Sequence, residues 1–153
     1  MGAPKSVVKI KKNGVEYISE VDKCQYYMFE LCRAALRDVG RFCVKRFRES
    51  YYSVFKRHTG KAGRATKYKV YSGKTTKYPR LEMGLPVGRV DGFYGYFQEV
   101  GTSRQPKLGL LTKVVQSNIP EIIKIESQYL SAMEDEARAL QLIDEGEYEG
   151  GTE

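Results

Sequence analysis

One amphipathic pattern, from about Ser19 to Arg57, constrains the fold of this 153-residue chain more than any other feature. Its apolar positions recur in steps of three and four, as one face of an α-helix requires; they include Tyr27, Leu31, Leu36, Val39, Cys43, Phe47, Tyr51 and Phe55. At about 1.5 Å per residue, the helix is near 50 Å long. Gly40 is the expected kink. So long a helix overhangs the core of a small domain, and such an overhang usually ends against another subunit.

The three cysteines, Cys24, Cys32 and Cys43, fall within this predicted helix. Their spacings separate the thiols by more than the limit of about 7 Å for a disulfide. We therefore expect three buried thiols on nearly one face. No second cluster of cysteine and histidine accompanies them, and His58 is the one histidine, so we expect no metal site.

Short extended segments surround the helix. Residues 7–18 form two of them around an Asn13-Gly14 turn, and we expect at least one to join the main sheet. Alternation around Tyr68 predicts a short strand or flexible hairpin. Residues 81–102 predict two further strands, separated by a turn at 88–92, with both faces of the second strand covered. Leu31, Leu36 and Phe47 of the helix are expected to face this sheet.

Helical periodicity returns at Leu108, and Pro120 either kinks that helix or stands in the first turn of another. The fold class is therefore α+β: a small twisted antiparallel sheet or partial barrel with a long N-terminal helix and a C-terminal helix. We expect one domain over residues 1–143, with a basic mobile loop at about 58–80. An acidic flexible tail is expected over 144–153.

The net charge of +7 is divided unevenly between two halves. Residues 1–80 carry 20 Lys and Arg against 6 Asp and Glu, whereas residues 81–153 carry 6 against 13. Such a chain can bind its own copies head to tail, or present its basic half to a polyanion. Residues 41–80 also interleave cations with aromatic side chains, which favours nucleic-acid binding as the alternative function. They match no familiar nucleic-acid module.

Catalysis finds little support in the sequence. A single histidine leaves nucleophiles without their usual base, and Glu134, Asp135 and Glu136 are consecutive, which spreads them around a helix. Gly73-Lys74-Thr75 lacks the first glycine of a phosphate-binding loop. We expect no enzyme, no catalytic residue and no cofactor. No apolar run reaches the length of about 20 residues that spans a bilayer, and the first residues lack a signal-peptide core, so we expect neither membrane insertion nor secretion.

The most specific stretch runs from Tyr94 to Leu111. It contains an aromatic-rich segment, a Glu-aliphatic-Gly-Thr-Ser turn, and a basic Gln-Pro segment that leads into an amphipathic helix; its core residues are Glu99, Val100, Gly101, Thr102, Ser103, Arg104, Gln105 and Pro106. Thr59-Gly60 precedes the sheet. Over residues 7–135 this order resembles a family of small tailed-bacteriophage structural proteins of the head–tail interface. The family commonly opens its last helix with Pro-Phe-Leu, where this chain has Leu108-Gly109-Leu110.

The resemblance implies a structural virion protein: a connector, tail-completion or tail-terminator component of the neck. It implies a homo-oligomeric ring, hexameric or twelve-fold, assembled in the host cytoplasm. Its expected partners are neighbouring neck, portal-adaptor or tail-tube proteins, with non-specific contact to packaged DNA. We expect the interface to include Glu99, Gly101, Thr102, Ser103, Arg104, Gln105 and Pro106, on a rigid strand-to-helix junction.

Overall fold

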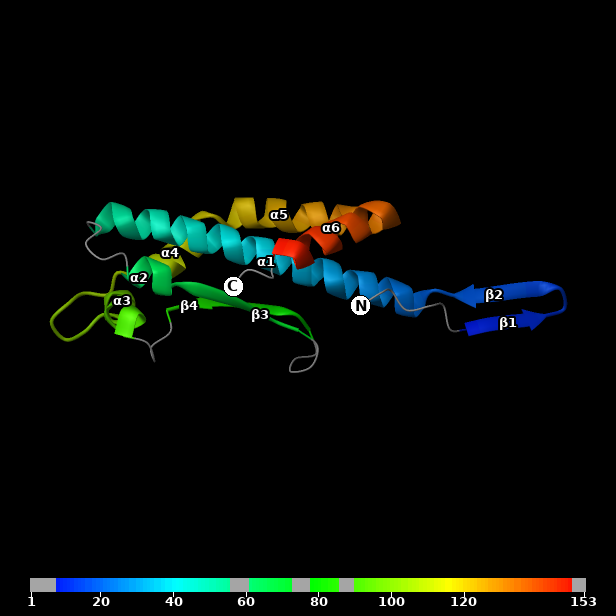
Figure 1. Ribbon diagram of the computed structural model, residues 1–153, viewed down its shortest axis with the longest axis horizontal. Coiled ribbons are helices and arrows are strands. Elements are labelled where there is room, and N and C mark those ends of the chain that lie inside the picture. Colours follow the sequence, from blue (N-terminus) through cyan, green and yellow to red (C-terminus); the bar gives the residue numbers. More distant parts are fainter. Residues whose placement is uncertain (1–7, 56–60, 73–77, 86–89, 150–153) are drawn as a thin grey trace.

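The computed structural model describes residues 8–55, 61–72, 78–85 and 90–149 (Figure 1). The fold is mixed α+β, with a long N-terminal helix, two small antiparallel sheets and C-terminal helices, which confirms the predicted class. In chain order the elements are β1 (Val8–Lys12), β2 (Val15–Ser19), α1 (Val21–Val54), α2 (Lys61–Ala65), β3 (Lys67–Tyr71), β4 (Arg80–Gly84), α3 (Val90–Val100), α4 (Leu110–Ser117), α5 (Ile119–Ser131), a 3-10 turn (Ala132–Glu134) and α6 (Glu136–Glu149).

Helix α1 is the axis of the molecule, and its bounds lie within three residues of those predicted from periodicity. Helices α5 and α6 lie along one side of it, and the β3–β4 hairpin lies along another (Figure 1). This arrangement buries two separate parts of the apolar stripe of α1. The described residues therefore form two core clusters rather than one.

The first cluster joins the N-terminal part of α1 to the C-terminal helices. Leu31, only 2% exposed, packs with Ala34 and Ala35 against Tyr129 and neighbouring residues of α5 and α6. The two alanines let the helices approach closely, because they place only a methyl group at the contact. Our expectation that Leu31 faces the sheet was wrong, because this part of α1 packs against α5 and α6 instead.

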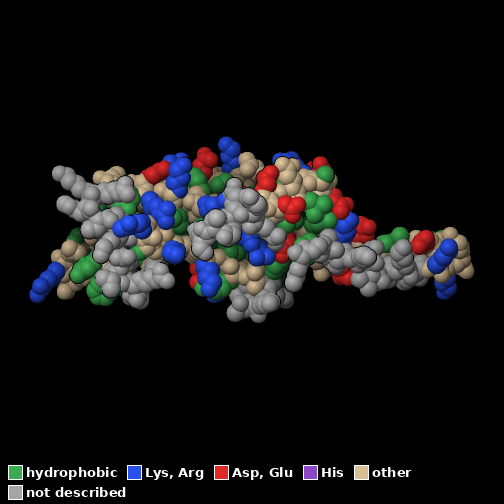
Figure 2. Space-filling view, viewed as in Figure 1, with side chains coloured by type: hydrophobic (Ala, Val, Ile, Leu, Met, Phe, Trp, Pro, Cys, Tyr) green, Lys and Arg blue, Asp and Glu red, His purple; other side chains and the backbone are tan. Residues whose placement is uncertain are grey.

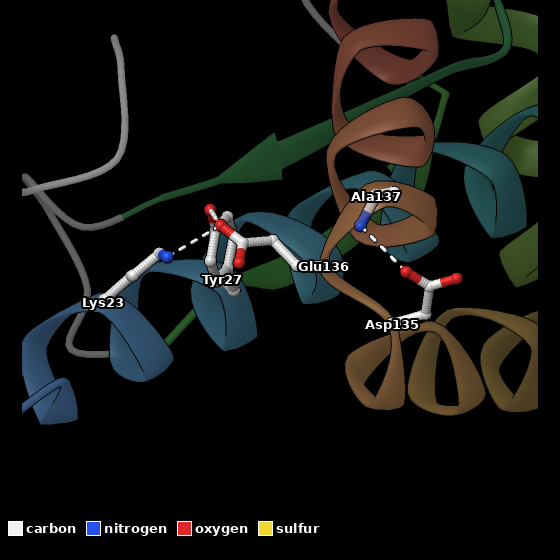
Figure 3. A network of polar contacts seen from close by, with 5 residues as sticks. All are labelled: Lys23, Tyr27, Asp135, Glu136 and Ala137. Atoms are coloured by element: carbon white, nitrogen blue, oxygen red, sulfur yellow. Dashed lines mark hydrogen bonds and ion pairs between the residues drawn. The ribbon is translucent and has the colours of Figure 1, made fainter.

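Polar contacts across α1 also hold the C-terminal helices (Figure 3). Lys23 Nζ lies 2.7 Å from Glu136 Oε1 at the start of α6, and the hydroxyl of Tyr27 donates to the same oxygen over 2.8 Å. Asp135 caps α6 by accepting from the N–H of Ala137. Of these consecutive carboxylates, Asp135 caps α6 and Glu136 binds α6 to α1.

The second cluster lies near the other end of α1, where Phe47 packs with Ala65, Leu85 and Val114. These residues come from α2, from the residue that follows β4, and from α4. Phe47 is 1% exposed, so this cluster fixes α2 and α4 to α1. Phe47 was expected to face the sheet. Leu85 borders β4, whereas Ala65 and Val114 belong to helices, so that expectation holds only in part.

Both pairs of strands are hairpins. β1 and β2 pair with each other around the predicted Asn13-Gly14 turn. Both turn residues have positive φ. In the described part of the chain neither strand joins β3 or β4, so the expected link to the main sheet was wrong. β3 covers the predicted strand around Tyr68, whose ring lies against Gly40 of α1.

Residues 90–100 form helix α3, not the second strand predicted for residues 81–102; the first strand of that pair is β4. The aromatic residues that favoured a strand instead make contacts four residues apart, with Phe93 and Phe97 rings 4.8 Å apart. Gly101 has φ 87° and donates its N–H to the carbonyl of Phe97. A glycine with positive φ ends a helix as readily as a strand, and the sequence was interpreted as the latter.

The cysteines also differ from expectation. Cys43 is buried, and burial raises the pKa of its thiol, but Cys24 and Cys32 are exposed. Whether a residue of α1 is buried depends on two things: the face of the helix that it occupies, and whether another element packs against that part of the helix. The prediction of three buried thiols is correct only for Cys43.

Toward the C-terminus, Pro120 stands in the first turn of α5, which follows Asn118 directly. Helix α6 continues to Glu149, so residues 144–149 of the predicted flexible tail are helical, and 150–153 lie outside the described residues. The predicted mobile loop at 58–80 contains α2 and β3; its residues 58–60 and 73–77 are likewise outside.

Candidate assembly interface

The segment that carries the family resemblance forms a tight connection between α3 and α4. Its first bend is at Gly101, where a Cβ would lie 2.9 Å from the backbone nitrogen of Lys107. Only glycine fits this close approach at φ 87°. The connection therefore folds back on itself immediately after α3, and the predicted strand-to-helix junction is a helix-to-helix junction.

Thr102 organises the turn that follows. Its N–H donates to the carbonyl of Gln105 over 2.9 Å, and its hydroxyl oxygen accepts from the N–H groups of Arg104 and Gln105. Ser103 and Arg104 stand between these anchor points, and both are exposed. The backbone of the turn is thus fixed while its side chains face solvent.

The connection is also attached to both flanking helices. The N–H groups of Leu108 and Gly109 donate to the carbonyls of Gln98 and Glu99, the last turn of α3. Gly109 occupies the N-cap position of α4 with φ 59° and has no side chain to cap it. Glu99 Oε1 supplies the cap instead, accepting from the N–H of Leu111 over 2.9 Å.

Helix α1 orients this unit. The hydroxyl of Tyr51 donates to Gln98 Oε1 over 2.6 Å, and its ring packs against Phe47 in the second core cluster. Burial raises the pKa of Tyr51, and the neighbouring Tyr52 adds a smaller effect in the same direction. The Tyr51 hydroxyl therefore keeps its proton at neutral pH. The turn is therefore connected to the core through two successive contacts.

The seven predicted interface residues divide into two groups by their structural role. Glu99, Gly101 and Thr102 shape the turn through the contacts described above. The others present exposed side chains: Ser103, Arg104, Gln105 and Pro106. If the turn binds a partner, this second group is the one that touches it.

Sequence analysis missed an exposed aromatic face on α3, the helix that leads into this turn. Its exposed residues are Phe93, Tyr94, Tyr96 and Val100, of which Tyr94 is 72% exposed. Buried Gly95 faces the other way, where a Cβ would lie 3.1 Å from Leu85. Interpreted as a strand, the segment was expected to be covered on both sides. A cluster of exposed aromatic residues is typical of a surface that binds another protein.

A second candidate surface is a basic cavity between α1, α2 and β3, with a volume of about 510 Å³. Five of its lining residues are cationic, and they are Arg41, Lys45, Arg48, Arg64 and Lys67. Arg48 is fixed there by donating to the carbonyls of Gly63 and Thr66. The cavity collects cations that the sequence spreads over residues 41–80.

Comparisons with protein-family models, with curated proteins and with solved structures each found no match. In the described ranges, no group of three or more His, Cys, Asp and Glu side chains is placed to hold a metal ion. No helix within those ranges has both the length and the apolar character needed to cross a membrane.

Proposed function

We propose that this chain is a structural virion protein of the head–tail interface of a tailed bacteriophage. It acts through contacts between its own copies and with neighbouring neck, adaptor or tail-tube proteins, as a ring component that connects, completes or terminates the tail. It performs no catalysis in this role. The proposal follows the resemblance carried by Glu99–Pro106 and the surrounding order of elements.

The observation that supports it most is the construction of the turn after α3. Backbone bonds at Thr102, the cap from Glu99 and the close approach at Gly101 all restrict it. A binding loop gains affinity from such restriction, because less conformational entropy is lost on association. Arg104 stands at its tip, and arginine is favoured at interfaces because its planar group binds carboxylates through two parallel bonds.

Reversal of the charge at this tip tests the proposal. Arg104→Glu keeps the backbone contacts of the turn, so the purified variant should melt like the wild type. Particles made with it should fail to join, and heads and tails should accumulate separately. Lys113→Glu, the same charge change at an exposed position of α4, is the matched control and should give joined particles. Normal infectious particles from Arg104→Glu would contradict the proposed role of the turn.

Nucleic-acid binding is the second candidate function, and the basic cavity favours it. Lys45 and Lys67 line this cavity from α1 and β3, and both are exposed. If the cavity binds nucleic acid, Lys45→Glu/Lys67→Glu should weaken binding and reduce its salt dependence by about two phosphate contacts. Lys113→Glu again serves as control.

A salt titration separates the two functions. A dedicated binder retains measurable affinity as salt rises through the physiological range, because cavity geometry adds to counterion release. A neck protein should show weak binding that moderate salt removes. Persistent affinity lost in the double variant would favour the second function.

A further inference from the structure

We propose that copies of this chain join by inserting the N-terminal hairpin of one copy into an apolar groove between α1 and α5 of the next. The hairpin, residues 8–19, is called the arm here. This inference rests on the self-association proposed above and specifies the segments that make the contact.

The arm projects beyond the body, roughly in line with α1 (Figure 1). Its exposed apolar side chains include Val15, Tyr17 and Ile18, and Tyr17 is 57% exposed. A two-stranded hairpin is only marginally stable in water without a surface to pack on. The arm therefore has both the composition and the energetic need for a partner surface.

The groove has a volume of about 350 Å³. Its exposed apolar residues come from α1, α5, the 3-10 turn and the segment before β4: Met28, Leu130, Met133 and Tyr78. Leu130 is 61% exposed, although Leu31 beneath it is buried. Cys32, one of the two exposed thiols, also lines this groove. The groove is therefore lined largely by apolar side chains, which suits apolar side chains of a partner.

Charge complementarity favours the arm as occupant. Lys11 and Lys12 stand at its tip, whereas Glu126 lines the groove and Glu134 follows Met133 at its edge. Residues 119–149 carry nine carboxylates against two cations. On the face shown in Figure 2, acidic and hydrophobic side chains gather at the end of the body from which the arm projects. Opposite charges at the rim would set the register of the contact.

The arm of the same copy does not occupy this groove. Met28 lies eight residues beyond Glu20, or about 12 Å along the axis of α1, and the arm points the opposite way (Figure 1). Insertion into another copy needs no change of fold. Such a contact uses different surfaces on its two sides, so repetition yields a closed ring when the geometry allows.

Two exposed double substitutions test the contact. Val15→Asp/Tyr17→Asp alters one face of the arm, because alternate residues of β2 share a face. Leu130→Asp/Met133→Asp alters the groove. Val54→Asp places the same charge at an exposed apolar position near the far end of α1, as a matched control. Sedimentation velocity should show assemblies for the wild type and Val54→Asp. Each double variant should be monomeric, with a dissociation constant raised by more than about tenfold.

Mixing the two double variants gives the decisive result. One intact arm and one intact groove remain, so the equimolar mixture should form a dimer and nothing larger. A mixture that stays monomeric would overturn the proposal, since it places the arm on its own copy or elsewhere. Double variants that assemble like the wild type would overturn the contact but leave ring assembly intact. A wild type that is monomeric at every concentration would contradict both.

Discussion

The carboxylate of Glu99, at the end of α3, accepts a hydrogen bond from the backbone N–H of Leu111, at the start of α4, over 2.9 Å. The contact spans the whole candidate turn and replaces the cap that Gly109 cannot provide. One side chain thereby links the shape of the turn to the stability of the helix after it.

Removal of this cap should loosen the turn. We expect Glu99→Ala to lower the free energy of unfolding by about 0.5–2 kcal/mol, the usual cost of a lost helix cap. Amide hydrogen exchange should accelerate at residues 102–111. Glu99→Gln keeps an acceptor oxygen and should lose less. Equal exchange rates in Glu99→Ala and the wild type would show that the turn holds its shape without the cap.

Gly40 should resist substitution even though it lies inside α1. Alanine normally favours a helix by up to about 1 kcal/mol over glycine. Here its Cβ would lie 2.4 Å from Cδ2 of Tyr68, so Gly40→Ala should destabilise the protein by about 1–3 kcal/mol. In a Tyr68→Ala background the same change should become neutral or stabilising. Denaturant unfolding of the four proteins measures this reversal, and a constant sign in both backgrounds would contradict it.

Acid should remove the contribution of Glu136 to the stability of the fold. Hydrogen bonds from Lys23 and then from Tyr27 lower the pKa of this carboxyl in the folded protein. A lowered folded-state pKa adds stability above the unfolded value, about 4.3, and that stability is lost as pH falls through the folded value. Glu136→Gln should therefore melt below the wild type at neutral pH, and the gap should close in strong acid. A gap that stays the same down to strong acid would contradict this contribution.

The stability that Tyr129 contributes should be lost at high pH rather than in acid. Its hydroxyl donates to Asp38 of α1, and burial together with this bond raises the pKa of Tyr129. The stability it adds is present below the unfolded value of about 10 and is lost only as pH rises through the higher folded value. At neutral pH, Tyr129→Phe should cost roughly 1–3 kcal/mol, as for a bond to a charged acceptor. Tyr94→Phe removes an exposed hydroxyl on α3 and should melt like the wild type at neutral pH.

Local patterns predicted the elements whose signals depend on their own residues. The periodicity of α1 and the Asn13-Gly14 turn depend on neighbouring residues, and both are confirmed. Of the two positions left open for Pro120, the structure has the first turn of α5. Segment 90–100 was wrong because its aromatic residues favour strands locally. In the structure Gly95 of this helix lies close to Leu85, a distant contact that no local pattern reveals.

In the candidate site, too, local features were predicted and features that depend on distant segments were not. Sequence analysis selected Glu99–Pro106 as one unit, and the structure brings these residues into one turn. It did not predict the exposed face of α3, because exposure depends on which segment covers that helix. Nor did it predict that Leu31 meets α5 and α6, since the partner of an apolar stripe is decided by distant chain segments.

Electron microscopy of particles produced from the genome that encodes this chain tests the central claim most directly. A reconstruction of the head–tail junction should contain a ring of copies of this chain, with Ser103–Pro106 of each copy against a neighbouring subunit or neck protein. Particles joined without this chain at the junction would contradict the account.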